Sequence, residues 1–205
     1  LLDSKFPPIV QHYGACVLYE TINDSWEYCS SKQEIVQRLK NILIEKLTMG
    51  AHMQNQSITN KLSSSLASFI LYCIPDIWPD PFGDIATLWS GQPELLLRVL
   101  TEIAAEFHRV RLPLRQRGVV KSILKQTIPN LIKIIEIVLN GENIPPSLKN
   151  AAVECAEQWL KLPGNDLAEW HSHLHLILLN IADDWYCLFF RSLFCFYFLQ
   201  DFLIT

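Results

Sequence analysis

Glycine is scarce in this sequence, with seven in 205 residues, and apolar and polar residues nowhere alternate over a long stretch. Glycine weakens helices, and strict alternation is the pattern of a half-buried strand, so both absences favour helices. Long runs rich in Leu, Ile, Glu, Lys, Gln and Ala separate the proline and glycine positions. The composition therefore predicts an all-α protein.

The sequence also lacks an excess of positive charge. Lys and Arg number 17 against 21 Asp and Glu, which gives a net charge of -4. Such a chain has no basic field that would hold nucleic acid. Half of the residues are apolar and 19% are charged, a balance that argues against intrinsic disorder.

Cysteine pairs of the CxxC type are absent, although the chain has six cysteines. Zinc-ribbon and thioredoxin-like proteins depend on such pairs, so their absence argues against both classes. Cys16 and Cys155 lie on apolar stripes with no histidine beside them in the sequence. They are expected to be buried, reduced thiols of a cytosolic or nuclear protein and not nucleophiles.

Catalytic motifs are missing as well: there is no glycine-rich phosphate loop, no GxSxG and no HExxH. The sequence predicts no enzyme activity and no cofactor. One cluster, His171-Ser172-His173-Leu174-His175, would offer three imidazoles to a metal ion if it formed a strand. On a helix only His171 and His175 would share a face, and surface histidines without a metal are the favoured interpretation.

Helical periodicity recurs between the proline and glycine positions. In the first pattern Val10, Tyr13, Val17 and Ile22 are expected to form a buried stripe. Ser57 is the expected N-cap of the third helix, Pro79 is expected in the first turn of the fourth, and Pro129 is expected to kink the sixth. The expected helices span 9–22, 33–49, 57–74, 78–90, 93–112, 115–140, 147–162 and 166–180.

These helices form pairs with a rough period. The first helix of each pair opens near Pro7, Gln56, Pro93 and Pro146, a mean spacing of (146 - 7)/3, or about 46 residues. HEAT and armadillo repeats have periods of about 40 to 47 residues. The period predicts a HEAT-repeat α-solenoid of about four antiparallel helix pairs, whose apolar stripes are buried by stacking.

Short segments from several of these helices, taken in order along the chain, resemble one family. Those in the first pair are Val10-Gln11-His12-Tyr13-Gly14-Ala15, Leu18-Tyr19, Trp26 and Leu39-Lys40. They resemble the second helical repeat of importin-β-type nuclear transport receptors. The later segments resemble the subfamily of importin 13 and transportin 3, and they are Leu66-Ala67-Ser68-Phe69, Trp78-Pro79-Asp80, Leu100-Thr101-Glu102, Glu106-Phe107, Arg111-Leu112-Pro113 and Trp159.

This resemblance implies a right-handed superhelix that binds the GTPase Ran in its GTP form near the N-terminus and binds protein cargo on its concave surface. It implies a receptor of cytoplasm and nucleus, with nuclear pore proteins as further partners. Full receptors are several times longer, so it also implies a fragment or truncated isoform without the first repeat and most later ones. A helical-repeat scaffold that binds proteins without Ran is the alternative.

In this family the second helix of each repeat lines the concave surface. Here these helices are 33–49, 78–90 and 115–140, and their apolar stripes face the repeat core. The opposite faces supply eleven candidate binding residues, chosen by helical geometry alone. They are Glu34, Gln37, Asn41, Glu45, Asp80, Asp84, Thr87, Lys121, Lys125, Asn130 and Lys133.

A basic cluster surrounds the start of the long helix at 115–140. Its members are Arg109, Arg111, Arg115, Arg117, Lys121 and Lys125. The cluster is either a solvated loop and helix start or a site for an acidic protein partner. Nucleic acid is disfavoured as its partner because no aromatic residues are interleaved with the cations.

The C-terminal stretch 181–205 departs from the family. Nine of the 22 aromatic residues fall within 185–205, whereas residues 1–180 form the expected HEAT-repeat segment. An altered C-terminus without a packing partner is the favoured interpretation. A membrane anchor at 185–204 is the alternative, against which Arg191, Gln200 and Asp201 count because charged and polar groups are costly within a bilayer.

Overall fold

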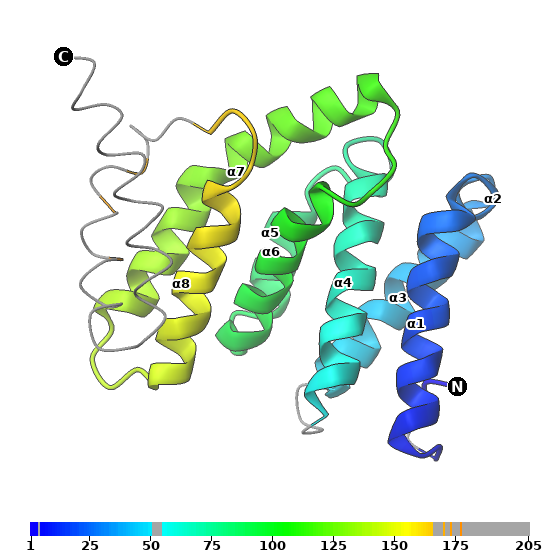
Figure 1. The fold of residues 1–205 in the computed structure, drawn as a ribbon, viewed down its shortest axis with the longest axis horizontal. Coiled ribbons are helices and arrows are strands. Elements are labelled where there is room, and N and C mark those ends of the chain that lie inside the picture. The colour runs from blue at the N-terminus through cyan, green and yellow to red at the C-terminus, as the bar shows by residue number, and fades with distance from the viewer. Residues whose placement is uncertain (4, 51–54, 166–169, 171–172, 174–176, 178–205) are drawn as a thin grey trace. The chain divides into compact units, whose positions relative to one another are not determined.

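The computed structural model describes residues 1–3, 5–50, 55–165, 170, 173 and 177. Within these residues there are eight helices and no strand, which confirms the all-α prediction (Figure 1). The chain divides into two compact units, Leu1–Ile128 and Pro129–Thr205. The helices are α1 (Pro8–Asp24), α2 (Trp26–Ser30), α3 (Gln33–Gly50), α4 (Gln56–Cys73), α5 (Pro81–Leu88), α6 (Pro93–Phe107), α7 (Leu114–Asn140) and α8 (Pro146–Leu160).

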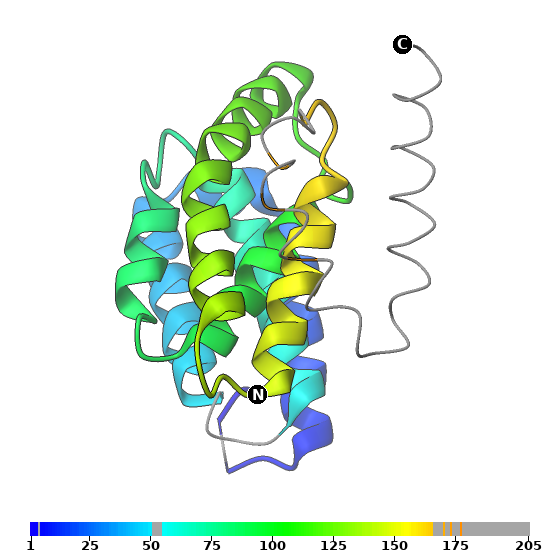
Figure 2. The ribbon, with the colours of Figure 1, turned by 90° about the vertical axis from the view of Figure 1, so that its left-hand side faces the viewer.

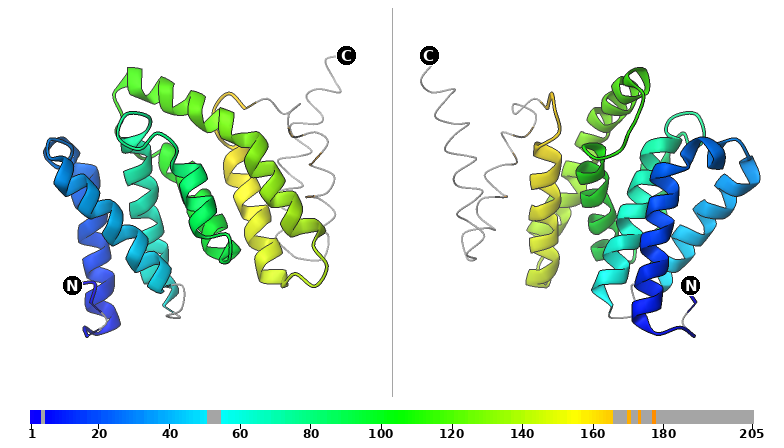
Figure 3. Two further views of the ribbon diagram at one scale, coloured as in Figure 1. Left: turned by 180° about the vertical axis from the view of Figure 1, so that it is seen from behind. Right: turned by 45° about the vertical axis from the view of Figure 1, so that its right-hand side comes forward.

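In the first unit α4 is the central helix. It packs against α1, α3 and α6, and every residue from Ser65 to Ile74 is buried. The helices α3 and α5 lie on the same side of α4 and α6 (Figures 2 and 3). Paired helices whose apolar faces stack on their neighbours are the HEAT-type arrangement expected from the sequence. The handedness of a superhelix stays a prediction.

The second unit contains the end of α7 and the whole of α8. Pro129, at its start, lies inside α7 and lacks the N–H that would continue the helical hydrogen bonds, but a kink there stays a prediction. The buried side chains of the second unit include Ile132, Ile135, Val138 and Leu139 of α7 and Leu148, Ala152, Cys155 and Trp159 of α8. Most of the expected helix 166–180, and all of the tail 181–205, lie outside the described residues.

Two expected helix starts are wrong by two residues. The N-cap of α4 is Asn55 and not Ser57, because the Asn55 side chain accepts a hydrogen bond from the Ile58 N–H at 3.4 Å. Asp80 caps α5 in the same way, accepting from the Gly83 N–H at 2.9 Å. Pro81, and not Pro79, therefore occupies the first turn of α5, where its missing N–H is harmless.

The stripe expected on α1 is also wrong in part. Ile22 is fully buried as expected, but Tyr13 is 63% exposed and Val17 is 36% exposed. Ala15 and Gly14 are buried instead. The buried face of α1 therefore passes through Ala15 and Ile22 and leaves Tyr13 and Val17 toward solvent.

Cysteines within the described residues are free thiols. Cys155 is buried as expected and Cys16 is only half-buried, while Cys29 and Cys73 are also buried. His12 lies one turn before Cys16, with its Nε2 at 3.7 Å from the sulfur, so a histidine that is not adjacent in the sequence lies close to this cysteine in space. Burial raises the pKa of Cys73 to about 12, which keeps this thiol protonated at neutral pH.

No helix of the described part of the chain is both long and apolar enough to cross a membrane. The stretch 185–204, considered above as an anchor, lies outside that part.

Candidate protein-binding surface

All eleven candidate binding residues are exposed in the structure. On α3 the helical period that buries Val36, Leu43 and Leu47 turns the opposite face to solvent. On this face the Gln37 amide donates a hydrogen bond to Asn41 Oδ1 at 3.0 Å. The four exposed candidates on α3 are Glu34, Gln37, Asn41 and Glu45.

Two of the three candidates near α5 have structural partners within the chain. Asp80 is the N-cap of α5. Asp84 Oδ2 accepts a hydrogen bond from Trp78 Nε1 at 2.7 Å and lies 3.7 Å from Lys40 Nζ. The third, Thr87, donates a hydrogen bond to the Gly83 carbonyl one turn earlier on its own helix, at 2.8 Å. The contacts of Asp84 with Trp78 and Lys40 indicate that this residue stabilises the surface formed by α3 and α5.

A cluster of Lys40, Trp78 and Asp84 links α3 to the start of α5. The Lys40 ammonium lies 3.6 Å from the centroid of the Trp78 ring, close enough for a cation–π interaction. Trp78 is 4% exposed, so the lysine covers a ring that is otherwise enclosed by protein. At the other end of the two helices, Trp89 Nε1 donates to Thr48 Oγ1 at 3.0 Å. These contacts fix α3 and α5 as one surface.

The candidates on α7 fall into both units. Lys121 and Lys125 lie in the first unit, and Asn130 and Lys133 lie in the second. All four are exposed, whereas the buried residues of α7 include Val120, Leu124, Leu131 and Ile135.

The basic cluster divides into two kinds of residue. Arg109 forms an ion pair with Glu106 at 2.8 Å. Arg117 donates to the carbonyl of Phe107 at 2.9 Å and to that of Val110 at 3.2 Å, which satisfies acceptors at the end of α6. Arg115, Lys121 and Lys125 are exposed, and no described acidic side chain forms an ion pair with them. Arg109 and Arg117 thus stabilise the fold, whereas Arg115, Lys121 and Lys125 are exposed and could contact a partner.

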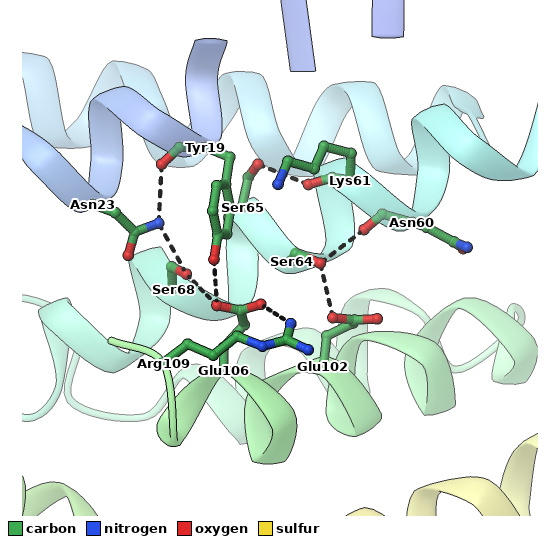
Figure 4. A network of polar contacts seen from close by, with 10 residues as sticks. All are labelled: Tyr19, Asn23, Asn60, Lys61, Ser64, Ser65, Ser68, Glu102, Glu106 and Arg109. Carbon is green, nitrogen blue, oxygen red and sulfur yellow. Dashed lines mark hydrogen bonds and ion pairs between the residues drawn. The ribbon is translucent and has the colours of Figure 1, made fainter. Parts of the chain in front are cut away.

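A buried polar network, which no sequence pattern predicts, joins α1, α4 and α6 (Figure 4). Its centre is the Glu106 carboxylate, which is 1% exposed. It accepts hydrogen bonds from Tyr19 Oη at 2.8 Å, from Ser68 Oγ at 3.3 Å and from Arg109 at 2.8 Å. Each hydrogen bond that a buried carboxylate accepts lowers the free-energy cost of moving its charge out of water.

The network shifts the ionisation of its members. Burial, together with the hydrogen bond to Glu106, raises the pKa of Tyr19 to about 12. The same carboxylate raises the pKa of Arg109, because a hydrogen-bonded anion favours the charged guanidinium. A second contact between the same helices lies one turn away, where Ser64 Oγ donates to Glu102 Oε2 at 2.8 Å. These groups are positioned to hold helices together and not to meet a ligand.

Of the histidine cluster, the structure describes His173 alone. His173 Nδ1 lies 2.5 Å from Glu136 Oε1 on α7, so this histidine pairs with a carboxylate. His171 and His175 lie outside the described residues. Among the described side chains, no group of three His, Cys, Asp or Glu residues could hold a metal ion.

The family model of exportin 1-like proteins matches residues 55–185, which is more than half of the chain. The chain belongs to the exportin 1-like family. The match includes α5 and α7 and their seven candidate residues, but α3 and its four candidates precede it.

Individual relatives of this exportin 1-like chain are importins. It is 26% identical to Importin-13 of Mus musculus and of Homo sapiens, in each case over 171 residues and 79% of the chain. Importin-13 of Gallus gallus is 26% identical over 114 residues. The importin-β-type relationship predicted from the sequence is therefore confirmed. The aligned part makes up 17% of the mouse and human relatives, so the chain spans about a sixth of their length.

Proposed function

We propose that this chain is part of a nuclear transport receptor that moves protein cargo between cytoplasm and nucleus under the control of Ran. Membership of the exportin 1-like family, with Importin-13 relatives, carries the proposal. GTP-bound Ran is its proposed regulator, protein cargo its second partner, and nuclear pore proteins further partners. A flexible stack of helix pairs suits such coupling because two ligands can favour different curvatures of one chain.

The proposed Ran-binding surface consists of the exposed faces of α3, α5 and the first half of α7. The helices α3 and α5 are joined by Lys40, Trp78 and Asp84, so their exposed faces are held as a unit. A stable interface needs about 800 Å² on each partner. Because the chain spans a sixth of its relatives, we expect weak binding by the chain alone and tighter binding by the full-length protein.

Calorimetric titration with Ran loaded with GTP or GDP tests the function. The GTP form should bind more tightly, both to this chain and to the full-length protein that contains it. Equal affinity for the two forms would refute control by Ran and leave a helical-repeat scaffold as the function.

A double variant tests the surface. Asn41→Arg with Thr87→Arg places two bulky charges on α3 and α5, and should cost about 2 kcal/mol or more in affinity for GTP-loaded Ran. Asp84 is unsuitable for substitution because it holds Trp78 and Lys40. The matched control is Thr21→Arg with Gln56→Arg, which adds the same charge to exposed positions of α1 and α4. Unchanged affinity in a folded Asn41→Arg/Thr87→Arg variant would refute this surface.

A further inference from the structure

The segment between Glu106 and Glu136 contains cations and no anions. Its seven Lys and Arg residues are not balanced by a single Asp or Glu within 107–135. The structure uses Arg109 and Arg117 internally, in the Glu106 ion pair and at the carbonyls that end α6. Three exposed cations of α7 remain in the first unit: Arg115, Lys121 and Lys125. None of them forms an ion pair with a described residue.

These three cations lie on one side of α7 together with exposed apolar residues. Leu114 is 88% exposed and Val119 is 42% exposed. Residues three, four and seven apart share a helix face, which places Leu114, Lys121 and Lys125 along one ridge and Arg115 and Val119 beside it. We call this surface the α7 patch: Leu114, Arg115, Gly118, Val119, Lys121 and Lys125.

A glycine lies at the centre of the α7 patch. Gly118 follows Leu114 by one turn and precedes Lys121 by one turn, inside a helix of 27 residues. A Cβ added at Gly118 would meet nothing within 4 Å, so nothing in the described chain requires a glycine here. Glycine in an exposed helix interior is unfavourable relative to alanine. The bare backbone it leaves permits another chain to approach α7 closely between the cations.

We propose that the α7 patch binds an acidic, partly apolar segment of a partner protein, with the backbone of that segment crossing α7 at Gly118. Carboxylates of the segment pair with Arg115, Lys121 and Lys125, and its apolar side chains cover Leu114 and Val119. The charge complementarity follows from the absence of any anion in 107–135. The patch shares Lys121 and Lys125 with the proposed Ran-binding surface, but this inference rests on the charge and shape of the patch and goes beyond the proposed function.

Nucleic acid carries the same charge but fits this patch less well. Single strands are held by aromatic side chains that stack on the bases, and residues 108–158 contain no Phe, Tyr or Trp. The exposed leucine and valine offer apolar contact, which a phosphate backbone would leave unused.

Fluorescence anisotropy with a labelled peptide, Glu-Glu-Leu-Glu-Glu-Leu-Glu-Glu, tests the proposal on the full chain at low salt. Binding should weaken as salt is added. The variant Lys121→Glu with Lys125→Glu should bind about tenfold or more weakly, because attraction at two sites becomes repulsion. The control Lys5→Glu with Lys32→Glu makes the same change in net charge at exposed positions outside the patch. Equal losses in the two variants would overturn the assignment of the patch.

Gly118→Ala separates a structural role from a binding role. The added methyl group fills open space, so the variant should unfold at a higher temperature. In the complex the same methyl group lies in the path of the peptide backbone, so affinity should fall about threefold or more. A stabilised variant with unchanged affinity would overturn the close approach at Gly118. Tighter binding of oligo(dT) than of the acidic peptide, lost in the Lys121→Glu/Lys125→Glu variant, would overturn the choice of partner.

Discussion

Replacing Glu106 should measure how far the buried network stabilises the first unit. In Glu106→Ala the hydroxyls of Tyr19 and Ser68 lose an acceptor that lies 2.8 Å and 3.3 Å away. Each loss costs about 1 kcal/mol, the low end of the range for buried groups, because the Tyr19 side chain is half-buried and the hydrogen bond from Ser68 is long. Removing the rest of a fully buried side chain leaves a cavity that costs about 1 kcal/mol more.

These contributions sum to a loss of about 3 kcal/mol in the free energy of unfolding, at the low end of the values measured when one partner of a buried ion pair is removed. The Arg109 ion pair adds little, because the arginine is 63% exposed and can turn to water. Glu106→Gln keeps the volume and an acceptor for Tyr19, so it should cost only about 1 kcal/mol.

Urea unfolding followed by circular dichroism measures both changes. Glu102→Ala is the matched control: it lies one turn earlier on α6, is half-buried and accepts a hydrogen bond from Ser64, so its loss should cost about 1 kcal/mol. The expected order of destabilisation is Glu106→Ala first, with Glu106→Gln and Glu102→Ala together well below it. A Glu106→Ala protein within about 0.5 kcal/mol of the wild type would refute the stabilising role of the network.

Two further predictions concern groups with raised pKa values. The pKa of Tyr19 is raised from 10.0 to about 12, so tyrosine in the unfolded chain loses its proton first and stability should fall between about pH 10 and pH 12. Tyr19→Phe should lessen that fall in urea titrations across this range, and an unchanged fall would contradict the assignment. Burial raises the pKa of Cys73 to about 12, so iodoacetamide at about pH 8 should modify native Cys73 far more slowly than half-buried Cys16, as read by mass spectrometry. Equal rates at the two cysteines would show that Cys73 is accessible.

The residues behind the family resemblance are mainly those that hold helices together. Tyr19 and Glu106 meet in the buried network, and Lys40 and Trp78 meet between α3 and α5. None of these four residues is among the eleven surface candidates. A resemblance recognised across distant segments therefore identified the fold and the family, while the binding surface rests on geometry and awaits the tests above.

Local physics made much of the fold predictable. Helices interrupted by proline and glycine follow from backbone propensity, and the exposed faces of α3 and α7 follow from the spacing of apolar residues along one helix. The two predicted helix starts were wrong where two nearby residues suit the same position of a helix equally well. Asn55 and Ser57 are both good N-caps, and Pro79 and Pro81 both suit a first helical turn. Only the tertiary structure decides that Asn55 caps α4 and that Pro81 begins α5.

Contacts between distant segments were decided by the tertiary structure alone. Tyr19 and Glu106 are 87 residues apart, and Asp84 meets Lys40 only because α3 and α5 lie together. Helical periodicity states which side of a helix is apolar, but it does not state which helix covers that side. For this reason the sequence determined the class of fold and the exposed faces, whereas the packing of α1, α4 and α6 decided that Glu106 is buried and that Tyr13 is not.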